Sequence, residues 1–156
     1  MKKKVSNILV GVSGEYFVAA ELSRRGYIAS ITLRNTKGID IVASSENGDK
    51  SVNIQVKSTS KKGIGWLLSK KAETVKDKNI FYVFVDLNED EKLPIFHIVP
   101  CRDVAKRVKD GHQNWLNTPG KKGQKHKDTN IRVWYASDNK YLNRWDLLKL
   151  DKQKTH

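Results

Sequence analysis

The stretch GIDIVASSENGDKSVNIQVKS, residues 38–58, constrains the fold of this chain more than any other segment. Two short apolar runs flank a polar turn whose central NG pair is a strong signal for a β-hairpin. Side chains alternate between the two faces of a strand, so the polar residues of the second run, Asn53, Gln55 and Lys57, share one face. The sequence therefore predicts two antiparallel strands that present polar groups together.

Asp40 is the polar residue of the first run, and it points away from the face that Ile39 and Ile41 share. The hairpin brings it alongside Gln55 and Lys57, so a carboxylate, an amide and an ammonium meet on one face. Taken alone, Asp40 is equally an acid beside a turn that pairs with Lys57 across the strands.

The segment VSGEYFVAAELSRR, residues 12–25, has helical spacing of its apolar residues, with Ser13 as a candidate N-cap and Gly26 placed to end the helix. Glu15 lies on or beside the apolar stripe of this helix. A carboxylate turned toward the core needs a cation, either Lys57 or a bound metal ion. The alternative is an acid near the helix N-terminus, stabilised by the helix dipole.

The rest of the chain alternates between strands and helices. Further strands are predicted at residues 27–33, 80–87, 94–100 and 131–136, with 80–87 apolar enough to be central. Further helices are predicted at residues 69–78, 101–110 and 139–150. A loop with the sequence TPGKKGQKHK separates the last strand from the helix before it.

The charge of the chain points to a polyanionic partner. Its 156 residues suit a single domain and contain 30 Lys and Arg against 17 Asp and Glu, a net charge of +13. Nucleic acid is the leading candidate, because the long apolar run or basic amphipathic helix of a membrane-binding chain is missing. With Cys101 as the single cysteine, the sequence excludes an internal disulfide and favours the reducing cytoplasm, and no targeting signal is recognised at its start.

The order of a helix with GE, then GID, then IQVKS resembles the PD-(D/E)XK nuclease superfamily, in particular its branches with glutamine at the second acidic position. The helix is similar to the first helix of small resolvase-like members. The resemblance implies an αβββαβ restriction-endonuclease-like core of the α/β (α+β) class, with a mixed central sheet flanked by helices. This core covers residues 1–86, and residues 87–156 add a strand, a short helix, a basic loop and a closing helix.

The resemblance also implies an activity, the cleavage of duplex or branched DNA with Mg²⁺ or Mn²⁺. Asp40, Gln55, Glu15 and the carbonyl of Val56 would bind the metal, and Lys57 would orient the attacking water. Glutamine binds a divalent ion less well than a carboxylate, so a catalytically silent DNA-binding module on the same fold is the alternative. An interaction subunit whose charge serves only solubility is a third hypothesis. Homodimers are common among such nucleases, because cutting two strands takes two sites.

Two groups of lysines are candidates for contacts with a phosphate backbone, although each lysine alone suits a solvated surface. They are Lys61, Lys62, Lys70, Lys71 and Lys76, and, in the glycine-containing loop, Lys121, Lys122, Lys125 and Lys127. Trp66 and Trp115 border these groups, where they would stack on bases or anchor the core, whereas Trp134 and Trp145 are assigned to the core. The four histidines lack the spacing of zinc ligands, and Cys101 is expected to be a small buried residue.

Overall fold

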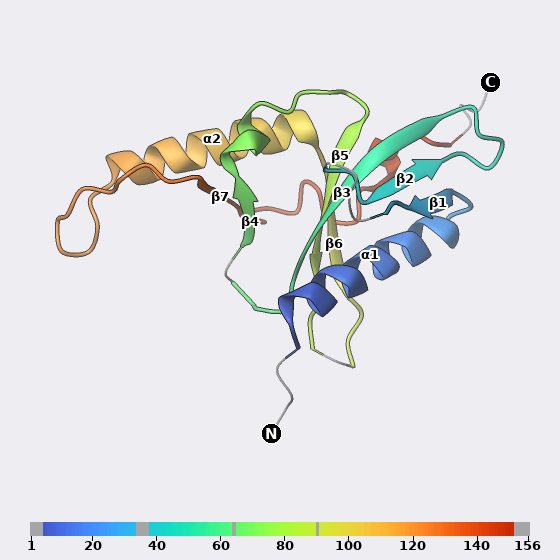
Figure 1. The fold of residues 1–156 in the computed structure, drawn as a ribbon, viewed down its shortest axis with the longest axis horizontal. Helices are drawn as coiled ribbons and strands as arrows, with labels where there is room; N and C mark the ends of the chain where they lie inside the picture. The colour runs from blue at the N-terminus through green and yellow to red at the C-terminus, as the bar shows by residue number, and fades with distance from the viewer. Residues whose placement is uncertain (1–4, 34–37, 64, 90, 152–156) are drawn as a thin grey trace.

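The computed structural model describes residues 5–33, 38–63, 65–89 and 91–151 (Figure 1). In chain order its elements are α1 (Asn7–Ser23), β1 (Ile28–Ile31), β2 (Ile41–Ser44), β3 (Ser51–Thr59), β4 (Trp66–Ser69), the 3-10 helix η1 (Lys70–Glu73), β5 (Ile80–Asp86), β6 (Ile95–Pro100), α2 (Cys101–Asn117), β7 (Ile131–Trp134) and the 3-10 helix η2 (Trp145–Leu148). The predicted strands and the first helix are all present.

Five strands form a mixed sheet in the order β1-β2-β3-β5-β6. The first three strands are antiparallel neighbours, β5 pairs parallel with β3, and β6 pairs antiparallel with β5. Strands β4 and β7 form a separate antiparallel pair. The predicted mixed sheet with helices at its sides is confirmed, and β5 lies inside the sheet as its apolar sequence indicated.

The sheet has a core on each face, because the side chains of β5 alternate. Val83 and Val85 belong to a cluster that includes the buried side of α1, whereas Tyr82 and Phe84 belong to a cluster with β4, β7 and the start of α2. In Figure 1, α1 and α2 accordingly lie on either side of the sheet. Within the described part of the chain, neither helix combines the length and the apolarity needed to cross a membrane.

Helix α1 begins five residues before the predicted start. Its N-cap is Ser6, whose Oγ accepts a hydrogen bond from the Leu9 N–H at 3.3 Å, and not Ser13. The Ser13 hydroxyl donates to the carbonyl of Val10 within the helix, at 3.1 Å. The predicted end is confirmed, since Gly26 adopts φ +83° three residues after Ser23.

The prediction of a basic helix at residues 69–78, the second helix of the expected αβββαβ core, is wrong. In its place the chain ends β4 at Ser69 and then forms only the single turn η1. The segment has few apolar residues to dock a helix, and only Ala72 of η1 is buried. Strand β4 is stabilised instead by its pairing with β7, a contact between distant parts of the sequence.

The C-terminal part of the chain differs from prediction at two helices. The short helix predicted at residues 101–110 continues to Asn117, and its buried residues lie only in the first half: Cys101, Val104, Ala105 and Val108. The second half of α2 therefore projects beyond the sheet, together with the loop that leads to β7 (Figure 1). The prediction of a closing helix at residues 139–150 is wrong, because the helical structure described there is only the short turn η2.

Candidate functional site

Asp40 lies one residue before β2, where the β2–β3 ladder ends. Ile41 and Ile54 are the last partners of that ladder, and the Asp40 N–H donates to the Ile54 carbonyl at 2.9 Å. A side chain makes the next contact, because the Val56 N–H donates to Oδ2 of Asp40 at 2.7 Å. On the other side, the Asp40 carbonyl accepts from the N–H of Thr32 at 2.9 Å. The sheet therefore fixes the carboxylate at the edge of β3.

Gln55 and Lys57 are half-buried on the face of β3 that points away from α1. The parallel register places them beside Tyr82 and Phe84, which belong to the cluster on the α2 side of the sheet. The hairpin ladder ends at Ile41 and Ile54, so it includes no pair between Asp40 and Gln55. Among the residues described, Asp40 and Lys57 form no ion pair, so the simple cross-strand pairing is not observed.

Glu15 reaches the same region from α1, which packs tightly on β3 at the preceding residue. A Cβ on Gly14 would lie 1.7 Å from Oγ of Ser58, so only glycine allows this approach. Glu15 and Asp40 then line one pocket of about 300 Å³. Gln55 and Lys57 do not line it. The structure thus gathers Glu15 with Asp40, and places Gln55 with Lys57 on the other side of β3.

The oxygen atoms around this corner suit a hard divalent cation. Asp40 and Glu15 supply carboxylates, and the Val56 carbonyl points to the same edge of β3 as the Val56 N–H, because both groups of a strand residue face one neighbour. In the described ranges, this corner included, no three His, Cys, Asp or Glu side chains are gathered in a way that could hold a metal ion. A metal site at this corner would therefore depend on backbone or amide oxygen in addition to the two acids.

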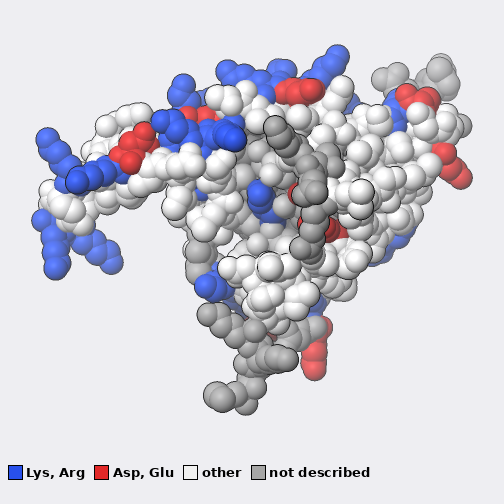
Figure 2. Space-filling model, in the orientation of Figure 1, with Lys and Arg blue, Asp and Glu red and all other residues white. Residues whose placement is uncertain are grey.

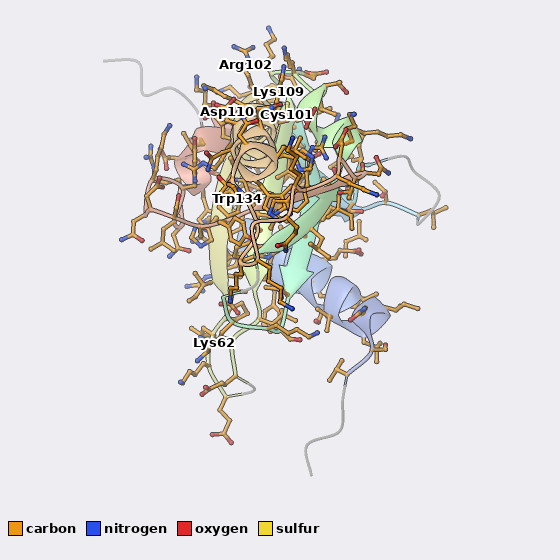
Figure 3. All side chains as sticks on the ribbon, turned by 90° about the vertical axis from the view of Figure 1, so that its left-hand side faces the viewer. Lys62, Cys101, Arg102, Lys109, Asp110 and Trp134 are labelled. Carbon is orange, nitrogen blue, oxygen red and sulfur yellow. The ribbon has the colours of Figure 1, made fainter. Side chains whose placement is uncertain are left out.

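The candidate phosphate-binding lysines are exposed but do not form one continuous track. Lys62 forms an ion pair with Glu89 at 3.1 Å, whereas Lys70, at the other end of β4, pairs with Asp128 at 3.2 Å. Figure 3, which looks along α2, shows Lys62 far below Trp134 and the α2 residues above it. Lys61 and Lys62 thus lie apart from Lys70, Lys71 and the lysines of the glycine-containing loop.

The four tryptophans divide between core and surface. Trp66 is buried, and its Nε1 donates to the Val85 carbonyl at 3.1 Å, so its suggested role in base stacking is wrong. Trp134 and Trp145 are buried, as predicted. Trp115 keeps 40% of its surface exposed near the end of α2 and remains a candidate for stacking.

Two further residues are buried on the α2 side of the sheet. His97 on β6 packs against the rings of Trp66 and Trp134, and burial lowers its pKa below the ordinary value. Its Nδ1 has no hydrogen-bond partner, so the expectation of a satisfied strand histidine is only partly met. Cys101 is buried as predicted, burial raises the pKa of its thiol, and Sγ donates to the Asp77 carbonyl at 2.9 Å.

The sequence did not single out three residues of a second pocket, of about 550 Å³, between α2 and β7. They are Arg107, His112 and Tyr135, which line it together with Trp115. One signal was available in the segment IRVWY. Side chains alternate along a strand, so once Trp134 is assigned to the core, Tyr135 lies on the outer face.

Comparisons with known proteins give a distant likeness to solved structures, three chains of which match. No family model and no curated protein matches the chain. Among solved structures, it is similar to a bacterial homing endonuclease, I-Ssp6803I, with 14% sequence identity and a TM-score of 0.46 over 65% of this chain and 74% of that one.

Proposed function

We propose that this protein is a nuclease that hydrolyses phosphodiester bonds in DNA with the help of Mg²⁺ or Mn²⁺. The observation that carries the proposal is the position of Asp40. A carboxylate is held at the open edge of β3 by the Val56 N–H, with Glu15 in the same pocket. Such a fixed pair of acids beside a basic chain fits the chemistry of phosphate-bound divalent ions.

The residues present fit such an ion. Asp40, Glu15 and the Val56 carbonyl would hold it, whereas Gln55, the further oxygen donor that the sequence suggested, does not line this pocket. When bound, the ion would neutralise charge on the scissile phosphate and lower the pKa of a water molecule. The hydrogen bond from Val56 holds one oxygen of Asp40 and leaves Oδ1 for the ion.

Lys57 is the residue of the protein that would supply positive charge for the reaction. It is half-buried, two residues beyond Gln55 on the same face, and has no ion pair with any residue that the structure describes. We assign to its ammonium group the positioning of the attacking water and the stabilisation of negative charge on the phosphate. Duplex or branched DNA is the expected substrate.

A catalytically silent DNA-binding module is the second candidate. The observation that favours it is the division of the site, since Gln55 and Lys57 lie outside the pocket shared by Glu15 and Asp40. Such a protein would bind DNA in a salt-dependent manner without turnover.

We also propose a homodimer formed through the outer face of α1. Large apolar side chains on this face and on the adjoining β1, outside the pocket of Asp40 and Glu15, are 41–64% exposed: Val5, Leu9, Tyr16, Phe17 and Ile31. The described part of α1 carries only Glu15 and Glu21 as charged residues, so two strongly basic chains can meet here without bringing cations together.

Calorimetric titration of Mn²⁺ and then Mg²⁺ into wild type and Asp40→Asn tests the metal site. The amide keeps an oxygen that can accept from Val56 but loses the charge, so the metal affinity should fall by at least ten-fold while the fold is retained. Glu46→Gln, which neutralises an exposed acid at the other end of the hairpin, is the matched control and should bind as wild type.

The outcomes separate the candidates. Metal binding and DNA cleavage that both vanish in Asp40→Asn support the nuclease. Binding that persists in this variant overturns the role of Asp40. If the wild-type protein binds DNA but binds no metal and cleaves no DNA, it is the silent module.

A further inference from the structure

The second half of α2 and the outer face of β7 enclose a groove that the core of the fold does not use. No residue of α2 after Val108 is buried, in contrast to its first half. On β7, Arg132 and Trp134 point inward, whereas Ile131, Val133 and the following Tyr135 line the groove. The pocket between these elements has a volume of about 550 Å³. This volume suits one or two nucleobases or a similar flat ligand.

Two aromatic rings of the groove are held in place yet exposed. Tyr135 is 53% exposed and lies against the bare Cα of Gly65, where an added Cβ would come within 2.8 Å of the ring. Trp115 is 40% exposed, stacks on His126 with a centroid distance of 4.0 Å and contacts the ring of His112 at 5.4 Å. Rings that are held by neighbours yet partly exposed are platforms on which a base can stack without a large loss of side-chain entropy.

The charge around the groove is positive and mostly uncompensated. Residues 101–134 contain nine Lys and Arg against three Asp and Glu. Two of the acids are engaged: Asp110 pairs with Lys106, and a hydrogen bond from His112, followed by one from Lys70, lowers the pKa of Asp128 to about 2. Figure 2 shows Lys and Arg side chains gathered at the projecting end of the molecule, where α2 and the loop to β7 lie.

The lysines of the loop between α2 and β7 carry no such compensation. Within the ranges that the structure describes, no ion pair involves any of the following: Lys121, Lys122, Lys125 and Lys127. Arg107 contributes a further cation at the groove itself, although Asp138 holds its guanidinium at 3.0 Å. A ligand that enters the groove therefore meets apolar rings inside and free positive charge at the rim.

We propose that this groove binds unpaired nucleotides, with bases stacked on Tyr135 and Trp115 and phosphates facing the loop lysines. A duplex keeps its bases stacked inside the helix and would leave these rings in water, whereas a single strand offers both a flat apolar face and a charged backbone. The proposal rests on the proposed function in taking DNA as the ligand. It adds that the substrate has a single-stranded or branched part that reaches the α2 side of the sheet.

Fluorescence anisotropy with labelled DNA tests the groove apart from catalysis. The protein carries Asp40→Asn and the buffer contains EDTA, and the probes are an oligothymidylate and a duplex of the same length. The single strand should bind more tightly than the duplex, and Tyr135→Ala should weaken single-strand binding by about ten-fold. Tyr135→Phe keeps the ring and should bind as the parent, which controls for changes in the fold.

A second measurement addresses the charged rim. Replacing the four loop lysines by Gln should reduce the slope of log affinity against log salt concentration by about 3 for a single strand. Equal affinity for duplex and single strand, or no effect of Tyr135→Ala, overturns the proposal. So does self-association of the protein that Tyr135→Ala abolishes, because the groove would then be a protein contact. Since no cleavage is measured, a catalytically silent protein can still meet these expectations.

Discussion

The two helices have the same length of 17 residues and opposite chemistry. Helix α1 has apolar residues on the side that packs on the sheet and on the side that faces solvent, and only two charged residues. Helix α2 carries six charged residues and buries apolar ones only in its first half. Each helix therefore has a surface that the fold does not use. We propose a second copy of the chain as the partner of the outer face of α1, and an anionic ligand as the partner of the end of α2.

The two helices also use glycine for different reasons, and the same substitution should expose this difference. Gly14→Ala places a methyl group 1.7 Å from Oγ of Ser58 and 2.8 Å from its Cβ, so α1 has to move away from β3. We expect a loss of about 3 kcal/mol in the free energy of unfolding, at the upper end of the usual cost of overpacking. Urea denaturation measures it.

The control for Gly14→Ala is the double variant with Ser58→Gly, which removes both atoms that the methyl group would meet. It should recover part of the lost stability. A single variant as stable as wild type would show that α1 does not pack on β3 as described, and that Glu15 has no fixed place beside Asp40.

The sequence predicted the α1 half of the molecule better than the α2 half, because the α1 half depends on local signals. The NG turn is confirmed, with Gly48 at φ +74° and its N–H donating to Ser45 at 2.9 Å. The short spacing between β2 and β3 then fixes the register of the hairpin, and with it the neighbours of Asp40. What the sequence could not show is where β2 ends, and hence that the Asp40 carboxylate takes the place of a backbone carbonyl opposite Val56.

The α2 half depends on contacts between distant residues. Strand β4 exists because Trp66 and its neighbours pair with β7, more than 60 residues later. The apolar residues of the segment 139–150 have helical spacing, but they make other contacts. Trp145 and Leu148 fill the core on the α1 side, and the Tyr141 carbonyl accepts from the N–H of Ile98 at 3.0 Å. Tertiary packing therefore overrode the local pattern at both wrongly predicted helices.

The outward surface of α1 gives the second prediction. If this surface joins two copies, Leu9→Gln combined with Tyr16→Gln should raise the dimer dissociation constant by at least ten-fold, because both side chains would lie at the centre of the contact. Analytical ultracentrifugation over a range of concentrations measures it. Leu93→Gln, at an exposed apolar residue far from α1 in the sequence, is the control. A wild-type protein that stays monomeric at all concentrations rules out the dimer.

The two faces of the sheet should also differ in their response to acid, since among the described residues the buried histidine, His97, lies on the α2 side. Burial lowers the folded-state pKa of His97 below 6.5, so below pH 6.5 the unfolded chain binds a proton that the folded chain does not. Stability should therefore fall as the pH drops from 6.5 toward the folded pKa, by at most about 1.4 kcal/mol per pH unit. Thermal unfolding at pH 7 and pH 5.5 measures the change.

His97→Phe, which keeps a ring against Trp66 and Trp134, should remove most of this acid sensitivity. His126→Asn, at the half-buried histidine of the loop, should retain it. Equal acid sensitivity of wild type and His97→Phe would assign the effect to other groups.

The smallest expected effect is that of Gly111→Ala, the counterpart in α2 of the change at Gly14. A Cβ at Gly111 meets nothing within 4 Å, so alanine should raise the free energy of unfolding by about 0.5–1 kcal/mol through its higher helix propensity. Urea denaturation checks the sign, which is opposite to that at Gly14. Gly111 also lines the groove beside Trp115 and Tyr135. A variant that gains stability but binds single-stranded DNA less well would show that the bare backbone at this position serves the ligand, whereas a loss of stability would contradict the exposed position of α2.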